Sequence, residues 1–385
     1  MNQKMKASKR LLSFLLCLVM VLGMLPAMSI TAAAYTAGDI EGTTGTGTVE
    51  DPVVCDTFAE FKAAMENTEI ICVKLNGASG AMPSRETLGA AISNTTYKVL
   101  TIEGTNTFWS PLSGNNDCLI WPKSELTING TGTLKYEHGN TGGMGAVINM
   151  SSNVLLTIDG NVTLEGGANG TAHGRAIAAH AGTTVINGGS FIGYSALNDD
   201  YTDTDAVIID NSAKVTINGG SFSASFYDAT GSKKAYGLAI RGTATGNISI
   251  KAGTFSQGID IVATGKTIET CGYFDTAKAS ITAGGSSVEA TASTDVLKNT
   301  EVIVTDTSVI GSVTVAVTTP VAGAAPATTS SGTANVTVSN YMWTIQPGGT
   351  GISSFEAGKT YRCTVLLNPA SGHTFKSNAT VTIGG

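Results

Sequence analysis

The chain repeats one short unit several times. In its clearest form the unit is an apolar run, a short turn, a second apolar run and then Asn-Gly-Gly-Ser-Phe, as at 176–191 and 206–222. Each unit contains one isoleucine at the same place in its pattern: Ile128, Ile158, Ile186, Ile217 and Ile250. Successive isoleucines of this set are 30, 28, 31 and 33 residues apart. A period in this range is typical of a solenoid, because one unit buries its apolar face only against stacked neighbours.

The runs inside each unit predict strands. They are roughly 4–6 residues long and rich in Thr, Val and Ile, which favours strands over helices. Asn-Gly suits the bend between runs, because both residues tolerate left-handed backbone angles. The sequence therefore predicts an all-β fold, a parallel β-helix with three short strands in each coil.

Aligning the units predicts two ladders that run from coil to coil. Four polar side chains fall at one corner, where they can hydrogen-bond to one another: Asn129, Asp159, Asn187 and Asn218. Six apolar side chains fall on one inward position, where we expect a continuous interior stack: Leu134, Leu164, Phe191, Phe222, Phe255 and Phe274.

Residues 1–34 predict a secretory signal peptide. Four basic residues within positions 4–10 precede an apolar run at 11–25, and Ala32, Ala33 and Ala34 supply small residues for cleavage before Tyr35. The run is short for a membrane span and Pro26 ends it. We therefore expect export, with no integral membrane segment after cleavage.

The charge of the mature chain limits its partners. Removing the four basic residues of the signal from the 22 of the whole chain leaves 18 against 29 acidic residues, a net charge of −11. Such a surface does not attract nucleic acid or anionic lipid. Five scattered cysteines remain, which make neither a disulfide scaffold nor a zinc signature. Cys55 and Cys72 could pair, and buried free thiols are an equal alternative.

Three further segments complete the expected organisation. Residues 35–50 are rich in Gly and Thr and predict a flexible leader. Within 51–98, Thr57 and Glu60 form a capping box that opens a short helix, which we expect to cap the solenoid together with its first strands. Four residues would form the apolar face of that helix: Phe58, Phe61, Ala64 and Met65.

Two resemblances follow from these motifs. We expect the β-helix over 99–306. Its units from Val99 to Phe274, with their Ile-Asn-Gly-Gly-Ser-Phe signature, resemble the pectate-lyase-like (pectin lyase-like) right-handed parallel β-helices of bacterial secreted and surface proteins. Residues 309–385 carry Trp343, Ala-Gly-Lys-Thr-Tyr and Gly-His-Thr-Phe, and resemble the immunoglobulin-like modules of Gram-positive cell-surface proteins. The second resemblance implies a small antiparallel β-sandwich. Such modules carry further strands, so the resemblance implies that this one is truncated at Gly385.

Strand parity predicts one polar column on the outside of the first strand of each coil. Side chains alternate between faces, so residues between the inward Ile and Ala positions point out. The predicted column is Asn149, His180, Asp210, Arg241 and Val262, and beside it run Val147, Ala178, Ile208, Ala239 and Asp260. Neighbouring coils lie ~4.8 Å apart. Asp210 would then have a base in the coil on either side, and Ala178 and Ala239 would leave a shallow floor.

The column supports two interpretations. As a ligand site, an acid/base histidine lies beside a carboxylate and a guanidinium that can hold the carboxylate of an acidic sugar. As a structural feature, it is a ladder of surface ion pairs that contribute little stability. A lyase of the resembling superfamily would need several carboxylates that hold calcium beside a base, and a hydrolase would need clustered carboxylates at acid/base spacing. One Asp in each column supplies neither pattern.

Two other groups are weaker candidates. Asp199, Asp200, Asp203 and Asp205 lie in one loop and supply oxygen ligands for calcium, but they lack the spacing of a calcium-binding loop. Several aromatic residues in or beside the longest loops could stack on sugar rings: Tyr194, Tyr201, Phe226, Tyr227 and Tyr236. His138 and His173 form no cluster.

The sequence thus favours a secreted, wall- or surface-associated bacterial β-helix that acts as an adhesin or glycan-binding stalk. We expect it to be a monomer that binds a polysaccharide or surface glycan and needs no cofactor. The alternatives are a polysaccharide lyase or glycosidase acting on an acidic glycan, and a structural spacer without a ligand.

Overall fold

The structure is a computed structural model. It describes residues 40–384 except 83–90, 111–117, 139–143, 169–172, 196–204, 227–234, 263–264, 318, 327–329 and 332. The predicted signal peptide and the first part of the predicted leader lie outside the described residues. Within the described ranges, no helix is both long and apolar enough to cross a membrane.

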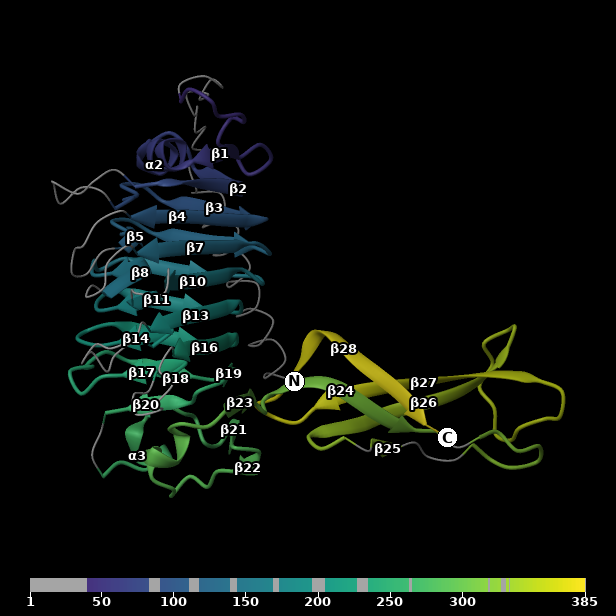
Figure 1. The fold of residues 1–385 in the computed structure, drawn as a ribbon. Coiled ribbons are helices and arrows are strands. Elements are labelled where there is room, and N and C mark those ends of the chain that lie inside the picture. Colours follow the sequence, from purple (N-terminus) through teal and green to yellow (C-terminus); the bar gives the residue numbers. More distant parts are fainter. Residues whose placement is uncertain are drawn as a thin grey trace, which may run out of the picture.

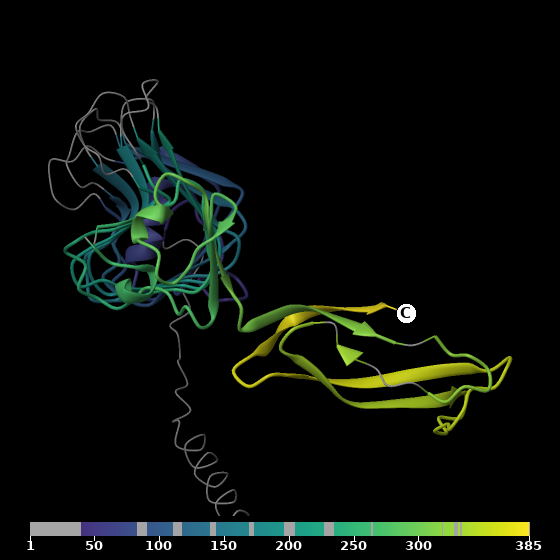
Figure 2. The ribbon, with the colours of Figure 1, turned by 90° about the horizontal axis from the view of Figure 1, so that it is seen from below.

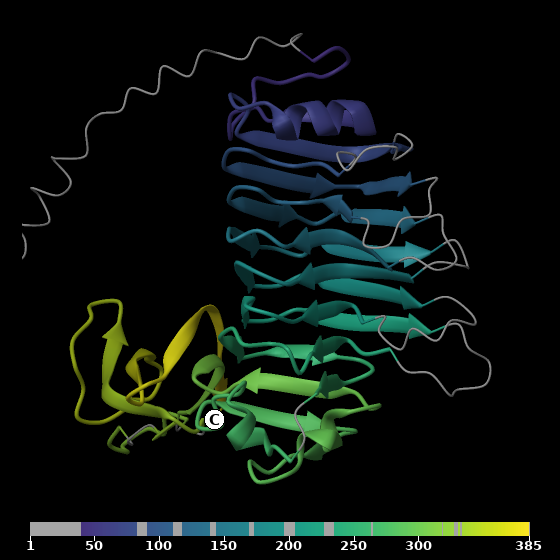
Figure 3. The same cartoon turned by 90° about the vertical axis from the view of Figure 1, so that its left-hand side faces the viewer.

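Most of the chain forms a β-solenoid of about five turns, with three stacks of parallel strands (Figures 1 and 3). The first stack contains β5 (Cys118–Ile120), β8 (Met144–Met150), β11 (His173–Ala179), β14 (Val207–Ile209), β17 (Leu238–Ile240) and β20 (Ile259–Ile261). The second stack contains β3 (Lys98–Glu103), β6 (Leu126–Gly130), β9 (Leu155–Ile158), β12 (Thr183–Ile186), β15 (Lys214–Ile217) and β18 (Ile248–Ile250). The third stack contains β4 (Thr105–Ser110), β7 (Thr133–His138), β10 (Thr163–Ala168), β13 (Ser190–Ser195), β16 (Ser221–Phe226) and β19 (Gly253–Phe255).

The strand register confirms the repeat read from the sequence. Each signature isoleucine of the second stack pairs with the signature isoleucine of the next coil, from Ile128 through Ile158, Ile186 and Ile217 to Ile250. Seen along the stack, the three faces close around a common interior (Figure 2). The parallel β-helix and its repeat are therefore present as predicted.

The interior stack is also present over most of its predicted length. Leu134, Leu164, Phe191, Phe222 and Phe255 pair in register from coil to coil and are fully buried. The Phe191 and Phe222 rings stack with centroids 4.9 Å apart, and the Phe222 and Phe255 rings with centroids 4.7 Å apart. Phe274 is buried in the same core but follows the last strand of this stack.

The predicted corner ladder is present from Asp159 through Asn187 to Asn218. The Asn218 side-chain amide donates to the Asn187 amide oxygen at 2.7 Å, and the Asn187 amide donates to the Asp159 carboxylate at 2.5 Å. The glycines, rather than the asparagines, adopt the positive φ at this bend. Gly130, for example, has φ 113°, and a Cβ there would lie 2.1 Å from the Ile102 carbonyl oxygen.

The N-terminal end begins with β1 (Val53–Thr57), α2 (Phe58–Glu66) and β2 (Cys72–Ala81), which pairs with both β3 and β4. The helix starts with the predicted capping box of Thr57 and Glu60, and its four predicted apolar residues are buried. Phe61 of α2 stacks on Phe108 inside the solenoid at 5.5 Å. The end of the expected flexible leader is held in place, because Ile71 and Cys72 donate backbone hydrogen bonds to the Gly47 carbonyl.

Lys98 lies inside this end of the solenoid. Its side chain is fully buried and its ammonium donates to the carbonyl oxygens of Asn67 and Ile70, just after α2, and to the Thr96 hydroxyl at 3.1 Å. Burial lowers the pKa of Lys98 to about 8, and the nearby Cys72 thiol only partly opposes this. The buried ammonium therefore joins the C-terminal end of α2 to the first coil through neutral oxygen acceptors.

The parallel coils of the first stack end with β20. After α3 (Ile268–Cys271), the strands β21 (Ala279–Ala283), β22 (Ser286–Ser287) and β23 (Val302–Asp306), with the 3₁₀ turn η1 (Thr294–Leu297), follow β20. β23 pairs antiparallel with both β19 and β21. The chain reverses here, so β23 covers hydrogen-bonding groups that a further parallel coil would otherwise pair.

The last segment forms strands separate from the solenoid (Figure 1). β24 (Val309–Ala316) joins β25 (Ser330–Ser331) and β28 (Thr374–Gly384) in one sheet, and β26 (Val336–Gln346) pairs with β27 (Thr360–Pro369). β24 and β28 are parallel, whereas the sequence predicted antiparallel strands throughout. The chain between β24 and β28 is long enough for the crossover connection that a parallel pair of strands requires.

Cys55 and Cys72 are both buried free thiols in the structure. This decides between the two alternatives for Cys55 and Cys72. Burial, with smaller effects from Glu60 and Asp56, raises the pKa of Cys55 to about 12, so this thiol remains protonated.

We predict that Phe222→Ala lowers the free energy of unfolding by roughly 3–5 kcal/mol, because it removes a buried ring that stacks on both neighbours. Chemical denaturation of the full chain would measure this. Tyr97→Ala, at an aromatic residue that is 43% exposed, is the matched control and should cost less than about 1 kcal/mol. Equal losses from the two variants would contradict the interior stack.

The buried Lys98 predicts a pH effect. Its folded pKa is about 8, against the ordinary lysine value of 10.5 in the unfolded chain, so the unfolded chain binds more protons between these values. Stability from this group therefore rises with pH across that window, by up to about 1.4 kcal/mol per unit. Relative to Lys98→Met, the unchanged protein should gain stability from pH 8 to pH 10 in denaturation curves. A constant difference between the two proteins would refute the buried charge.

Candidate functional site

The predicted outer column forms on the first stack. His180, Asp210 and Arg241 directly follow β11, β14 and β17. The backbone N–H of Asp210 donates to the Ala179 carbonyl at 3.0 Å, and that of Arg241 donates to the Ile209 carbonyl at 2.9 Å. The three residues therefore occupy equivalent positions in consecutive coils. The inward positions of the same strands are buried in the core, as strand parity predicts: Ile177, Ala179, Val207, Ile209, Leu238, Ile240, Ile259 and Ile261.

Asn149 occupies the neighbouring column instead. It pairs in register with Ala178, and Asp260 pairs with Ala239 at the other end of the same column. The His180 N–H donates to the Met150 carbonyl, so the residue across from His180 is Ser151. The connection between β8 and β11 sets this offset of two residues, and the repeat spacing alone did not reveal it. The Asn149 amide oxygen accepts a hydrogen bond from the Ser151 hydroxyl.

His180 and Asp210 form a close pair. The Nδ1 atom of His180 lies 2.6 Å from the Oδ1 atom of Asp210. Both side chains are partly buried, with 29% and 18% exposure. Because Nδ1 faces the carboxylate, Nε2 on the opposite side of the ring is the nitrogen that a ligand could approach. A carboxylate that orients an imidazole in this way is compatible with acid/base chemistry.

Arg241 belongs to a second group of charges. Its guanidinium donates to the Oδ2 atom of Asp205 at 2.8 Å and lies 3.8 Å from the Oδ2 atom of Asp260. Lys298 lies 3.1 Å from the other oxygen of Asp260 and 3.2 Å from Asp295. The sequence places Arg241 next to Asp210 in the column and near Asp260. Both neighbours are present, but the ion pairs that join Arg241 to described residues are those to Asp205 and Asp260, and not one to Asp210.

Asp205 and Lys298 are the site residues that sequence reasoning did not find. Asp205 was grouped with the acidic loop, yet its side chain is fully buried and also accepts the backbone N–H of Tyr236 at 3.0 Å. Asp205 lies two residues before the inward Val207, and strand parity puts both on the same face. This parity was the signal in the sequence for the burial of Asp205. Lys298 comes from the segment after η1, beyond the last coil, and no period in the sequence connects it with Asp260.

The floor of the face is buried. The Arg241 side chain starts after β17 and ends at Asp205, which precedes β14. The outward residues Ala178, Ile208 and Ala239 are only 3%, 5% and 0% exposed, and they form an apolar cluster with Cys118 and Ala146 against which Ala91 and Trp121 pack. The open shallow floor expected between the two columns is therefore not present.

Two pKa shifts reflect the same group of charges. Burial, reinforced by Asp260 and Asp205 against the weaker effect of Lys298, raises the pKa of the Tyr236 hydroxyl. Burial alone would lower the pKa of Lys298, but hydrogen bonds and charge from Asp260 and Asp295 outweigh it and raise the pKa. Tyr236 therefore remains a neutral hydroxyl and Lys298 a cation at neutral pH.

The other predicted candidates are only partly described. Asp199, Asp200, Asp203, Tyr201 and Tyr227 lie outside the described residues, as do the side chains of Phe226, His138 and His173. Among the residues that the structure describes, no group of three or more His, Cys, Asp or Glu side chains is arranged to hold a metal ion.

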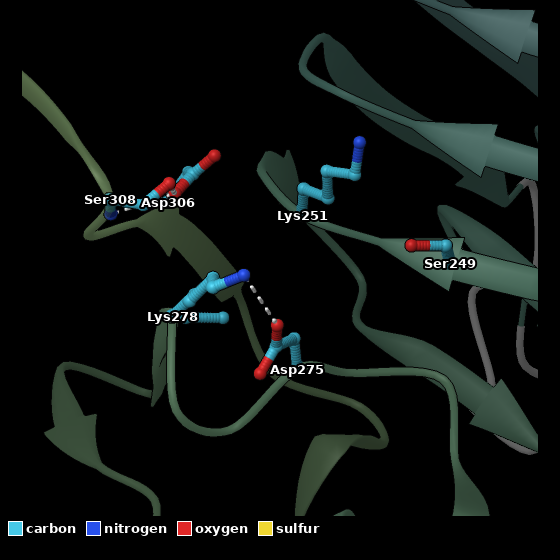
Figure 4. A pocket seen from close by; sticks show the side chains of 7 residues that line it. Ser249, Lys251, Asp275, Lys278, Asp306 and Ser308 are labelled. Carbon is cyan, nitrogen blue, oxygen red and sulfur yellow. Dashed lines mark hydrogen bonds and ion pairs between the residues drawn. The ribbon is translucent and has the colours of Figure 1, made fainter. Parts of the chain in front are cut away.

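A separate hollow of about 230 Å³ lies beside the end of the solenoid, before β24 (Figure 4). Lys278 lies 3.7 Å from Asp275, and Asp306 accepts hydrogen bonds from the Ser308 N–H at 2.8 Å and hydroxyl at 2.6 Å. Lys251 contributes a second ammonium. With two lysines and two aspartates in its lining, the hollow is polar and balanced in charge, and it shares no lining residue with the first-stack column.

Comparisons with protein-family models, with curated proteins and with solved structures gave no match to this chain.

The ion pairs of the first stack predict unequal effects of charge removal. Arg241→Met should lower the free energy of unfolding by about 3–5 kcal/mol, because it leaves the buried Asp205 carboxylate without its cation. Asp210→Asn should cost no more than about 1 kcal/mol, because the His180 pair is partly exposed.

Adding Asp205→Asn to Arg241→Met is the control, and it should recover much of the loss since no buried charge then remains. Denaturation of the four proteins would measure this coupling. If the double variant is as unstable as the sum of its single changes, Asp205 and Arg241 are not coupled.

Proposed function

We propose that this protein is an exported, cell-surface β-helix that binds glycans as an adhesin or stalk and does not cleave them. The predicted signal peptide supports export. The regular solenoid supports a stalk, because its ladders continue from coil to coil and need no cofactor. The partner is a polysaccharide or a surface glycan, and the acting unit is the monomer.

The observation that carries this proposal is the pairing of charges on the first stack. A hydrolase needs one carboxyl group that gives a proton to the leaving oxygen and a second that acts as base or nucleophile. Among the described residues, Asp205 adds a carboxylate to this face but is buried and bonded to Arg241, and Asp260 is shared by Arg241 and Lys298. Both carboxylates are therefore engaged in holding the face together.

Finer assignments belong to the same proposal. The solenoid is of the pectate-lyase-like type and right-handed, with α2 as its N-terminal cap. The contact of Phe61 with Phe108 supports the cap, since it places the apolar face of α2 on the interior of the first coils. The strands from Val309 onward form an immunoglobulin-like module, which the small buried core of Ile310, Val313, Val315 and Val336 supports.

A second candidate is a polysaccharide lyase that acts on an acidic glycan. The hydrogen bond between His180 and Asp210 favours it, because an oriented imidazole can remove a proton next to a uronic acid carboxylate. The third alternative, a structural spacer without a ligand, needs only the ladders already described.

A glycan panel tests these alternatives. The mature chain would be incubated with plant, mucin and bacterial glycans, and both binding and cleavage products would be measured. We expect binding without new reducing or unsaturated ends. Cleavage that disappears in His180→Ala, with an unchanged thermal melt, would establish the lyase instead. If the protein neither binds nor cleaves any glycan of the panel, the structural spacer is the remaining alternative.

A further inference from the structure

The hollow of Figure 4 lies where three parts of the chain meet. Six polar residues line it, from the end of β18, the turn before β21 and the end of β23: Ser249, Lys251, Asp275, Lys278, Asp306 and Ser308. The backbone N–H of Ile250 in β18 donates to the Tyr273 carbonyl at 2.8 Å, and Ala279 of β21 pairs with Asp306 of β23. Backbone hydrogen bonds of the solenoid end therefore hold these three parts together.

Two charged groups of the hollow are left without a partner among the described residues. The Oδ1 atom of Asp306 accepts both hydrogen bonds from Ser308, whereas its Oδ2 atom has no hydrogen bond or ion pair within the described ranges. Asp275 and Lys278 face each other at 3.7 Å, and the Asp275 Oδ1 atom also accepts the Ala277 N–H at 3.2 Å. The Lys251 side chain is exposed, and no ion pair joins its ammonium to the described residues. One cation and one carboxylate oxygen therefore remain available.

These available groups define the chemistry of a ligand. An ammonium such as that of Lys251 forms its strongest hydrogen bonds with anionic oxygens, above all those of a carboxylate. The free Oδ2 atom of Asp306 accepts only, so it requires a donor such as a hydroxyl. The hollow holds about 230 Å³, which is less than the ~300–1,000 Å³ of sites that enclose drug-sized ligands. It therefore suits one ring-sized group that carries both a carboxylate and hydroxyls.

We propose that the hollow binds one acidic sugar residue at the end of a glycan chain. The sugar carboxylate accepts from the Lys251 ammonium, and a ring hydroxyl donates to the Oδ2 atom of Asp306. Because the hollow has room for a single ring, it takes the end of a chain and leaves the other residues of the glycan outside. This inference rests on the proposed function and assigns to it a ligand class and a place.

Availability and shape separate this hollow from the other basic side chains. On the first stack, Arg241 and Lys298 are already bonded to Asp205 and Asp260, so a sugar carboxylate would have to displace a carboxylate of the protein. Lys214, on the same stack as Lys251, is exposed as well, but it does not line the hollow. The hollow combines an available cation with a concave surface and a carboxylate that accepts hydroxyl groups.

Titration of the mature chain with small sugars tests the hollow. The probes are the methyl glycosides of glucuronic and galacturonic acid, each beside its neutral hexose counterpart, and binding would be measured by calorimetry and saturation-transfer NMR. We expect at least one acidic glycoside to bind about tenfold more tightly than its neutral counterpart, the magnitude of one charge-assisted hydrogen bond. Lys251→Met should remove this tenfold preference, and Asp306→Asn should weaken binding of the acidic and neutral sugars alike.

Lys214→Met is the matched control, because it removes the same charge from the same stack outside the hollow, and it should leave binding unchanged. Thermal melts verify that all variants fold. If the acidic glycosides bind no better than the neutral ones, or if Lys251→Met keeps the preference, the hollow is refuted while binding of the larger glycans of the panel still supports the proposed function. If the protein binds neither these sugars nor any glycan of the panel, both proposals are refuted.

Discussion

The parallel stacking of coils is the constraint on which the whole structure depends. Each side chain of a coil meets, ~4.8 Å away, the residue one period earlier and one period later. Residues that interact well with copies of themselves are therefore favoured in every column. Aromatic rings stack, as Phe191, Phe222 and Phe255 do, and side-chain amides donate to one another, as Asn218 and Asn187 do.

Charged side chains satisfy the same constraint differently. Like charges in one column repel, so signs alternate or the side chains leave their column. His180 and Asp210, in consecutive coils of one column, form a hydrogen bond. Arg241 instead leaves its column and donates to the buried Asp205. Lys98 is the extreme case, since its ammonium lies inside the solenoid and relies on neutral oxygens.

The three stacks consequently have different roles. The second stack contributes the corner ladder, and the first stack carries the paired charges. The third stack contributes the interior stack of Phe191, Phe222 and Phe255. A solenoid separates such roles easily, because each face is a different register position of one repeating unit and changes at one position leave the other two intact.

The sequence by itself determined the repeat, the inward positions and the two ladders, because period-2 alternation and a period near 30 residues are properties of the chain that each coil repeats. It determined α2 through the local capping box of Thr57 and Glu60. Only the tertiary structure decided that Asn149 pairs with Ala178, since the connections between strands vary in length. It alone also joined Asp205 and Lys298 to Arg241 and Asp260, because long side chains reach across columns and a chain reversal places β23 beside β19. Neither effect follows a period that the sequence displays.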